Sequence, residues 1–342
     1  DGIAACIFIG EILATYDGLI RGFSSENRLA NIIPHRLLER EWLPPVRKSA
    51  RPEPPPAAPV EVVPPPQLSC SDRIRQAREA YDFIALYPAI LAGSAQGDRT
   101  TEKTNSHVIG HDCPLITSLL SREQTERIRL LAENVGGLND VLLAWLFQAM
   151  HDWQHPHGSW WNRGTYRITV PANLRPAGER SLSSANCISY AFLDRKHHDC
   201  QAAANLLPAI AHATKAIVRY DLSRQFLAFL SQSCRYPAWF RWNVRRGSRM
   251  SSSVLSYVGD PSRRFTARLP RQDGWVMAGG LIMERFVGAP PVRPNTRLAI
   301  AVTTYRDQLG LAATYDQQLW GRETAQQFLD AYVQLLLQSA EA

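Results

Sequence analysis

The stretch LAIAVTTYRDQLGLAATYD (298–316) holds two apolar, β-branched runs separated by a short polar break at 306–308. Runs of this kind on either side of a tight turn are typical of an antiparallel hairpin, so both are predicted to be strands. The surrounding segment 274–315 is predicted to be strand-rich. Upstream, TYRITVP (165–171) has the period of two that marks a strand. Its inward-facing residues are expected to be Tyr166, Ile168 and Val170.

Helical patterns alternate with these strands. SREQTERIRLLAENVGG (121–137) begins with Ser121 and Gln124, which form a capping-box pattern, and it ends at two glycines. Residues 200–233 are predicted to form two helices. The segment 322–338 places one apolar face on a closing helix, made of Ala325, Phe328, Leu329, Tyr332 and Leu336. Strands and helices in this order predict an α/β sandwich.

Composition limits the function classes. The chain has 342 residues, of which 45% are hydrophobic and 20% charged, as expected of a globular protein. Its six cysteines are scattered, which argues against a zinc site or a disulfide framework and suits a reducing cytoplasm. No run of about 18 apolar residues is seen, so no transmembrane helix is expected. The net charge is +7 and only four of 38 basic residues are lysine, which indicates either an anionic partner or a coding bias toward arginine.

The N-terminal part has two distinct segments. IAACIFIGEILATY (3–16) is apolar almost all round and is predicted to be a buried helix. Residues 44–66 contain ten prolines, which exclude regular helix or a central strand. We interpret 44–68 as a polyproline-type linker, with a ligand for a signalling domain as the alternative.

Several motifs occur in a fixed order along the chain. They are Asp1-Gly2, GGLNDVLLAWLFQAM (136–150), YRITVPANLRP (166–176), SSANCISY (183–190), SVLSYVG (253–259) and the hairpin 298–316. This series resembles the chloramphenicol-acetyltransferase-like superfamily, with condensation-type and wax-ester-synthase-type acyltransferases as the closest members. The resemblance implies a two-lobed α/β sandwich of mixed sheets and helices. Residues 1–43 would end the N-terminal lobe, which is otherwise mostly missing, and 69–342 would form the C-terminal lobe.

In the resembled enzymes the catalytic motif reads His-His-x-x-x-Asp-Gly. The resemblance therefore implies that Asp1 and Gly2 are the last two positions of this motif, with the general-base histidine just upstream. Such a histidine takes a proton from an alcohol or amine, which then attacks an acyl thioester. No metal or cofactor is implied, and the substrate donor would be acyl-CoA or an acyl group on phosphopantetheine. The alternative is a chance dipeptide before a helix.

The resemblance also implies substrate-binding positions, each of which has a structural alternative. Asn139 could instead be a helix cap, and the Asn173 and Arg175 pair could instead order a surface turn. Tyr257 stands where many relatives have Asn. The full set of implied substrate-binding residues is Asn139, Asn173, Arg175, Ser253, Ser256, Tyr257 and Gly259.

Two histidine groups and one arginine-rich segment could also be mistaken for functional sites. The histidines of HDWQHPH (151–157) and of His197-His198 are expected to be exposed rather than metal ligands. RYPAWFRWNVRRGSRM (235–250) mixes aromatic residues with arginines. It is either a membrane or carrier contact or a helix with a solvated basic face. No nucleic-acid fold signature accompanies it, so nucleic acid is not an expected partner.

The function predicted from the sequence is thus acyl transfer from a thioester to an alcohol or amine by a cytoplasmic enzyme, with peripheral membrane association as an alternative. Two other classes stay open. The protein is either a catalytically dead acyltransferase-like binding module or a condensation enzyme that works with a carrier protein. No nucleophile elbow, dinucleotide fingerprint, P-loop or zinc-protease motif is present.

Overall fold

The computed structural model describes residues 2–22, 88–89, 91–92, 114–157, 164–175, 186–201, 203–233, 236–238, 250–265, 268–292, 296–318 and 320–341. The proline-rich segment 44–68 and the domain boundaries placed around it lie outside these residues. The same holds for Asp1 and for most of 235–250. The domain division therefore stays a prediction.

A six-stranded mixed sheet is the centre of the molecule, with strand order β1-β9-β8-β4-β2-β3. Its strands are β1 (Leu115–Leu119), β2 (Thr165–Asn173), β3 (Ile188–Lys196), β4 (Ser253–Gly259), β8 (Leu298–Tyr305) and β9 (Gln308–Tyr315). Strand β4 pairs in parallel with both β2 and β8, and the other pairings are antiparallel. The carboxyl ends of the parallel strands β2, β4 and β8 therefore lie together at the same end of the sheet, which we call the carboxyl edge.

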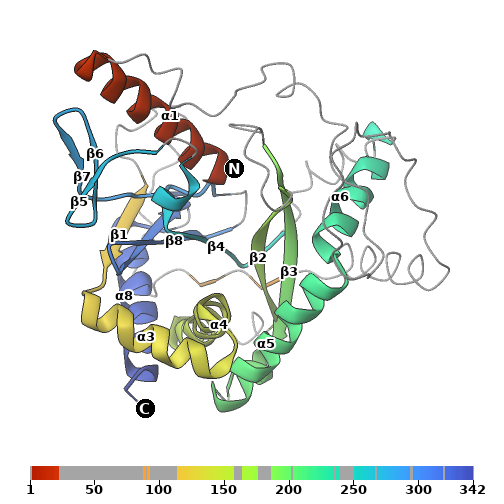
Figure 1. Cartoon of the computed structure of the whole chain (residues 1–342). Coiled ribbons are helices and arrows are strands. Elements are labelled where there is room, and N and C mark those ends of the chain that lie inside the picture. Colours follow the sequence, from red (N-terminus) through yellow and green to blue (C-terminus); the bar gives the residue numbers. More distant parts are fainter. Residues whose placement is uncertain are drawn as a thin grey trace.

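Helices cover one face of this sheet (Figure 1). They are α3 (Arg122–Val135), α4 (Leu138–His157), α5 (Ala203–Arg219) and α8 (Arg322–Ser339), while α6 (Leu222–Ser233) packs on β3. The core lies between the sheet and the helices, in one cluster of buried apolar residues that includes Phe147 of α4, Phe328 of α8 and Ile300 of β8. The predicted apolar face of the closing helix is confirmed, because all five of its residues are fully buried.

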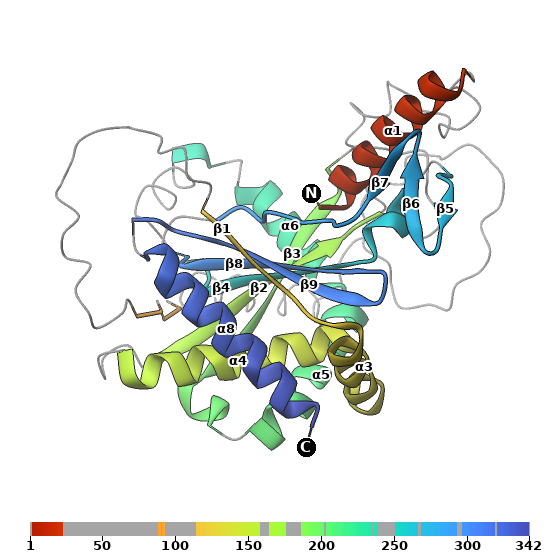
Figure 2. The same cartoon turned by 90° about the vertical axis from the view of Figure 1, so that its left-hand side faces the viewer.

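On the opposite side of the sheet lie α1 (Gly2–Arg21) and a small sheet of β5 (Arg271–Gln272), β6 (Trp275–Ala278) and β7 (Leu281–Met283) (Figure 2). Helix α1 packs on β6 and on the short 3₁₀ helix η5 (Pro261–Arg264). A second 3₁₀ helix, η4 (His197–Cys200), follows β3. Strand-rich structure over 274–315 is thus confirmed.

Helix α1 corrects the expectation that 3–16 is buried on all sides. Only one of its faces is buried, and Phe8 and Ile12 on the other face are 53% and 51% exposed. The all-round burial expected of 3–16 is wrong, because the small sheet and η5 contact a single side of the helix. By length and composition α1 also passes as a membrane span, with 39% of its most apolar window buried.

Local sequence signals set most element ends. Ser121 and Gln124 form the predicted capping box, and Gly136 ends α3 with a φ of 144°. The 306–308 break is confirmed as a hairpin turn, in which Arg306 and Asp307 have φ values of 50° and 60°. Helix α4 begins at Leu138, one residue before Asn139. Asn139 therefore lies in the first turn, and the alternative interpretation of Asn139 as the helix cap is wrong.

Candidate active site

The N-terminal end of α1 meets the carboxyl end of β4. A Cβ built on Gly2 would lie 3.6 Å from Val258 Cγ2, and Figure 1 shows this end of α1 directed at the sheet. Asp1 lies outside the described residues, but its neighbour Gly2 and the strand end at Gly259 are thus side by side. Two of the predicted motifs, far apart in sequence, come together here.

Two contacts hold α1 in this orientation. Gly10 faces Phe265 so closely that a Cβ at Gly10 would lie 2.8 Å from the ring Cγ. Near the other end, the Gly279 amide donates to Asp17 Oδ1 at 2.6 Å, and Arg21 Nε pairs with the same oxygen at 2.8 Å. Asp17 is fully buried, so its charge is neutralised by these donors.

The register of β4 separates its predicted site residues by face. Ser253, Leu255 and Tyr257 pair with Leu298, Ile300 and Val302, which belong to the helix-facing core. Ser256 pairs with Ala301 and lies on the other face, toward α1. Strand β4 ends in a register shift before Gly259, whose φ of 76° favours glycine. Of the β4 residues, Ser256 and Gly259 therefore lie toward α1.

Ser253 lies at the other end of the strand. It is fully buried, and its hydroxyl donates to the Leu298 carbonyl at 3.0 Å. Six residues separate it from Gly259, which corresponds to about 20 Å along an extended strand. The structure does not bring Ser253 to the α1 end of β4.

Asn173 and Arg175 follow the carboxyl end of β2, at the carboxyl edge, where Gly259 also lies. Asn173 Oδ1 accepts from both the backbone N–H and Nη1 of Arg175, each at 3.2 Å. Burial lowers the pKa of the Arg175 guanidinium from its usual value, against the opposing effect of the neighbouring Cys187. A guanidinium oriented in this way and partly removed from water is suited to binding a carboxylate or another oxyanion.

Asn139 lies elsewhere. It is on α4, beneath the helix-covered face of the sheet, while α1 lies beyond the opposite face (Figure 2). Its neighbour Asp140 accepts a hydrogen bond from Thr214 Oγ1 at 2.7 Å, which ties α4 to α5. The structure gives this region a packing role and does not bring Asn139 together with Gly2.

The described cysteines are unsuited to nucleophilic catalysis. Burial raises the pKa of the Cys6 thiol to about 11 and that of Cys200 to about 12. Both groups are therefore thiols rather than thiolates near neutral pH. Within the described residues there is no cluster of three or more His, Cys, Asp or Glu side chains that would hold a metal ion.

Two of the histidines predicted to be surface residues, His151 and His197, form a partly buried cluster instead, whereas His155 is exposed as predicted. His151 is buried on α4, and its ring stacks on His197 of η4 at 4.2 Å between centroids. Tyr166 Oη and His197 Nδ1 are 3.1 Å apart. The surface interpretation of these two residues is wrong because α4 and the β3–η4 corner pack together, which sequence spacing does not reveal. His198 is exposed, as predicted.

Sequence reasoning also missed a buried ion pair on the α1 side of the sheet. Arg167, which is 2% exposed, donates from Nε and Nη2 to the two carboxylate oxygens of Asp194 at 2.7 and 2.8 Å. Together with Thr169 it was expected to face outward, yet both are buried. Facing charges of opposite sign on neighbouring strands were the available signal.

Comparisons with known proteins establish the fold. No protein-family model and no curated protein sequence matches the chain. Among solved structures, it is similar to the first condensation domain of the calcium-dependent antibiotic synthetase in complex with a substrate analogue. The TM-score is 0.57 at 16% identity, over 99% of this chain and 62% of that one. A second structure of this domain gives 0.55 at 14% identity, over 99% and 61%.

A trichothecene 15-O-acetyltransferase from Fusarium sporotrichioides is also similar, with a TM-score of 0.56 and 12% identity. This match covers 80% of the present chain and 53% of the acetyltransferase. The chain thus spans roughly three fifths of the condensation-domain structures and about half of the acetyltransferase. The mixed sheet, its helical layer and these likenesses together show that the chain has the fold of condensation domains and of the chloramphenicol-acetyltransferase-like superfamily.

Proposed function

We propose that the protein, with the sequence that precedes Asp1, transfers an acyl group from a thioester to an alcohol or an amine. The observation that carries this proposal is the contact between the start of α1 and the end of β4, inside a condensation-domain fold. Gly2, the second residue of the predicted Asp-Gly pair, lies at this contact. A histidine four positions before Asp1 would lie near the carboxyl edge.

In the proposed reaction the histidine removes a proton from the acceptor O–H or N–H. The resulting nucleophile attacks the thioester carbonyl carbon, and the carbon–sulfur bond then breaks. The histidine returns the proton to the leaving thiolate, and no acyl-enzyme forms because the acceptor itself attacks the thioester. The amino end of α1 faces this region, and its partial positive charge would favour the oxyanion of the intermediate.

Arg175 has a positioning role in this proposal. Its partly buried guanidinium lies at the carboxyl edge and is suited to pairing with the Asp1 carboxylate. Such a pair would orient the loop that carries the histidine. Ser256 and Gly259 would line the acyl site from β4, whereas the register of β4 directs Tyr257 to the opposite face of the sheet.

The donor is either acyl-CoA or an acyl group on a carrier protein. Both carry phosphate, and η5 presents arginines close to the start of α1, of which Arg263 is 84% exposed at its side chain. If the donor is the acyl group on a carrier protein, the protein is a condensation enzyme. Cytoplasmic location, and membrane contact through 235–250, remain parts of this proposal that rest on the sequence alone.

The test is a thioester assay on the protein expressed with its preceding sequence. Acyl-CoA and acyl-carrier donors are offered with a panel of alcohols and amines, and released thiol is followed spectrophotometrically. Replacing the motif histidine by Ala should lower the rate by at least about 100-fold. Arg175→Gln should lower kcat and Arg175→Lys should restore part of it, whereas the exposed control Arg322→Gln should have no effect.

A histidine variant with full turnover would refute the proposed mechanism. A sequence without that histidine, combined with tight thioester binding and no turnover, would favour the binding-module alternative. A rate confined to the carrier-bound donor would identify the protein as the carrier-dependent condensation enzyme.

A further inference from the structure

Strand β1 forms one edge of the six-stranded sheet, and within the described residues it pairs with β9 alone. At its ends, the Leu120 N–H donates to the Leu309 carbonyl and the Pro114 carbonyl accepts from Tyr315 N–H. In an antiparallel pair, alternate residues bond to the same neighbour, so the even-numbered residues of β1 face β9. The backbone N–H and C=O groups of the remaining residues, Leu115, Thr117 and Leu119, therefore point away from the sheet.

The side chains of these same three residues share one face of the sheet. Thr117 pairs with Ala312 and Leu119 with Gly310. A Cβ built on Gly310 would lie 3.4 Å from Thr303 Oγ1 and 3.8 Å from Leu119 Cδ1, so both side chains lie on the face away from the helical layer. Leu119 is 46% exposed.

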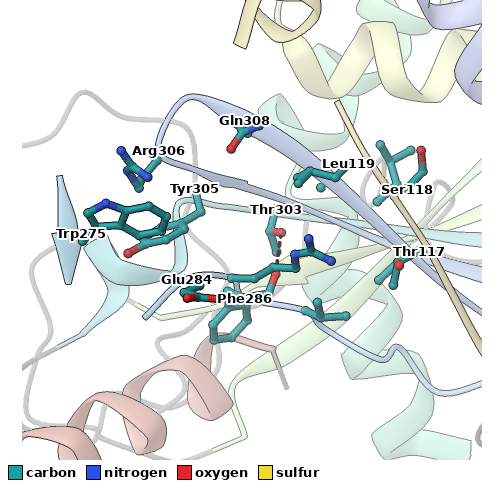
Figure 3. A pocket seen from close by; sticks show the side chains of 15 residues that line it. Thr117, Ser118, Leu119, Trp275, Glu284, Phe286, Thr303, Tyr305, Arg306 and Gln308 are labelled. Carbon is teal, nitrogen blue, oxygen red and sulfur yellow. Dashed lines mark hydrogen bonds between the residues drawn. The ribbon is translucent and has the colours of Figure 1, made fainter. Parts of the chain in front are cut away.

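A strap made of residues 284–290 crosses this face and forms the wall of a pocket of about 310 Å³ (Figure 3). Thr303 Oγ1 donates to the Phe286 carbonyl at 3.4 Å, and Thr314 Oγ1 donates to the Pro290 carbonyl, so the strap is tied to the sheet. The floor is small and apolar, with Gly310 and Ala312 among its residues. The pocket thus opens beside the outward-pointing backbone of β1.

The charge around the pocket is uneven. Arg306 lies 3.4 Å from the centroid of the Trp275 ring, and Asp307 is engaged by Arg129 at 3.4 Å. Figure 3 places Glu284 on the Trp275 side, across the pocket from Thr117. Arg285 is exposed and forms no ion pair with any of the described residues. Together with Arg306 it gives the pocket lining two positive charges against the one negative charge of Glu284, so an acidic ligand group is favoured.

We propose that the β1 edge and this pocket are a docking site for an extended segment of a partner protein. The segment would add to the sheet as a strand, bonding to the backbone of Leu115, Thr117 and Leu119. One of its side chains would enter the pocket, and an acidic side chain would pair with Arg285. This site is independent of the proposed acyl-transfer chemistry.

The first test uses acetylated, fluorescent eight-residue peptides of alternating Val and Thr, with Glu, Gln or Lys at one central position. Binding is followed by anisotropy, and the Glu peptide is expected to bind about tenfold more tightly than the Lys peptide. Amide exchange should slow at Leu115, Thr117 and Leu119 on binding, and stay unchanged at Ile116 and Ser118. Amides at the three outward positions that are already protected without peptide would overturn the proposal.

Two variants separate the contribution of the β1 backbone hydrogen bonds to peptide binding from that of the Arg285 charge. Thr117→Pro removes an outward-pointing N–H and leaves the bonds to β9, so it should abolish binding, while Thr117→Val should keep it. Arg285→Glu should invert the preference from the Glu to the Lys peptide, and the exposed control Arg322→Glu should not. Binding that survives Thr117→Pro, a preference unchanged by Arg285→Glu, or an edge occupied by a second copy in light scattering would each overturn the proposal.

Discussion

Gly10→Ala tests how α1 is held at the candidate site. Gly10 lies in the middle of α1, and a Cβ there would approach Phe265 Cγ at 2.8 Å and Phe265 Cβ and Cδ1 at 2.9 Å. One of these contacts is to the Cβ of Phe265, which is attached to the backbone. A ring rotation therefore cannot relieve the overlap, and α1 must move away from the segment after η5.

Two effects of opposite sign compete. Ala is favoured over Gly inside a helix by about 1 kcal/mol. Overpacking a well-filled contact costs about 1–3 kcal/mol. Because the overlap involves a backbone-attached atom, we expect the packing cost to dominate, so that Gly10→Ala lowers the free energy of unfolding by about 1–2 kcal/mol. Displacement of α1 would also change the position of Gly2 relative to Val258, so thioester turnover should fall by more than the loss of stability explains.

The assay is urea unfolding of the single variants and the double variant, combined with amide exchange of α1. In a Phe265→Gly background, which also lacks the Cβ of residue 265, the overlap is gone, and Gly10→Ala should become stabilising by its helix propensity, about 1 kcal/mol. The sign of its effect should thus invert between backgrounds. Stabilisation by Gly10→Ala with Phe265 in place would refute this account of how α1 is seated.

Three further outcomes are expected. Tyr332→Phe should lower the free energy of unfolding by about 1 kcal/mol in urea titrations, because it removes the hydrogen bond at 2.8 Å to the buried Leu142 carbonyl. Arg167→Met should cost about 1–2 kcal/mol, because it removes the bidentate partner of Asp194 while that carboxylate, 31% exposed, can still be solvated; an unchanged midpoint would contradict the pair's role. The raised pKa of Cys6, about 11, means that the native thiol should resist iodoacetamide at pH 8. Its contribution to stability, complete below the ordinary thiol pKa, should be lost as the pH rises toward 11.

Sequence reasoning predicted those features of the fold that depend on neighbours along the chain. The capping box at Ser121, the turn at Arg306 and the apolar face of 322–338 each follow from residues within one or two turns of each other. The resemblance of the ordered motifs added the fold itself. Prediction from the sequence failed where the burial of a residue depends on a second element. His151 is an example, because it is buried only through the packing of α4 on η4.

For the candidate site, too, the sequence predicted which residues belong to it, and only the structure showed which of them face it. Gly2, Asn173, Arg175 and Gly259 were chosen from motifs, and the structure places them at the end of α1 and at the carboxyl ends of parallel strands. Whether a given motif residue faces that site depended on register, which no motif encodes. Ser256 lies on the α1 side, while Ser253 donates its hydroxyl within the sheet.

The sequence by itself determined which segments are strands and helices, because periodicity, caps and turn residues act over short distances. Only the tertiary structure decided which of these segments meet. The contact of α1 with β4, the burial of Arg167 and the position of β1 at the edge of the sheet, as far as the described residues form it, all result from packing and strand order. These features depend on contacts between residues far apart in the chain. The energies of such contacts are set by complementary shape and by which residues of two paired strands form hydrogen bonds, and not by local sequence pattern.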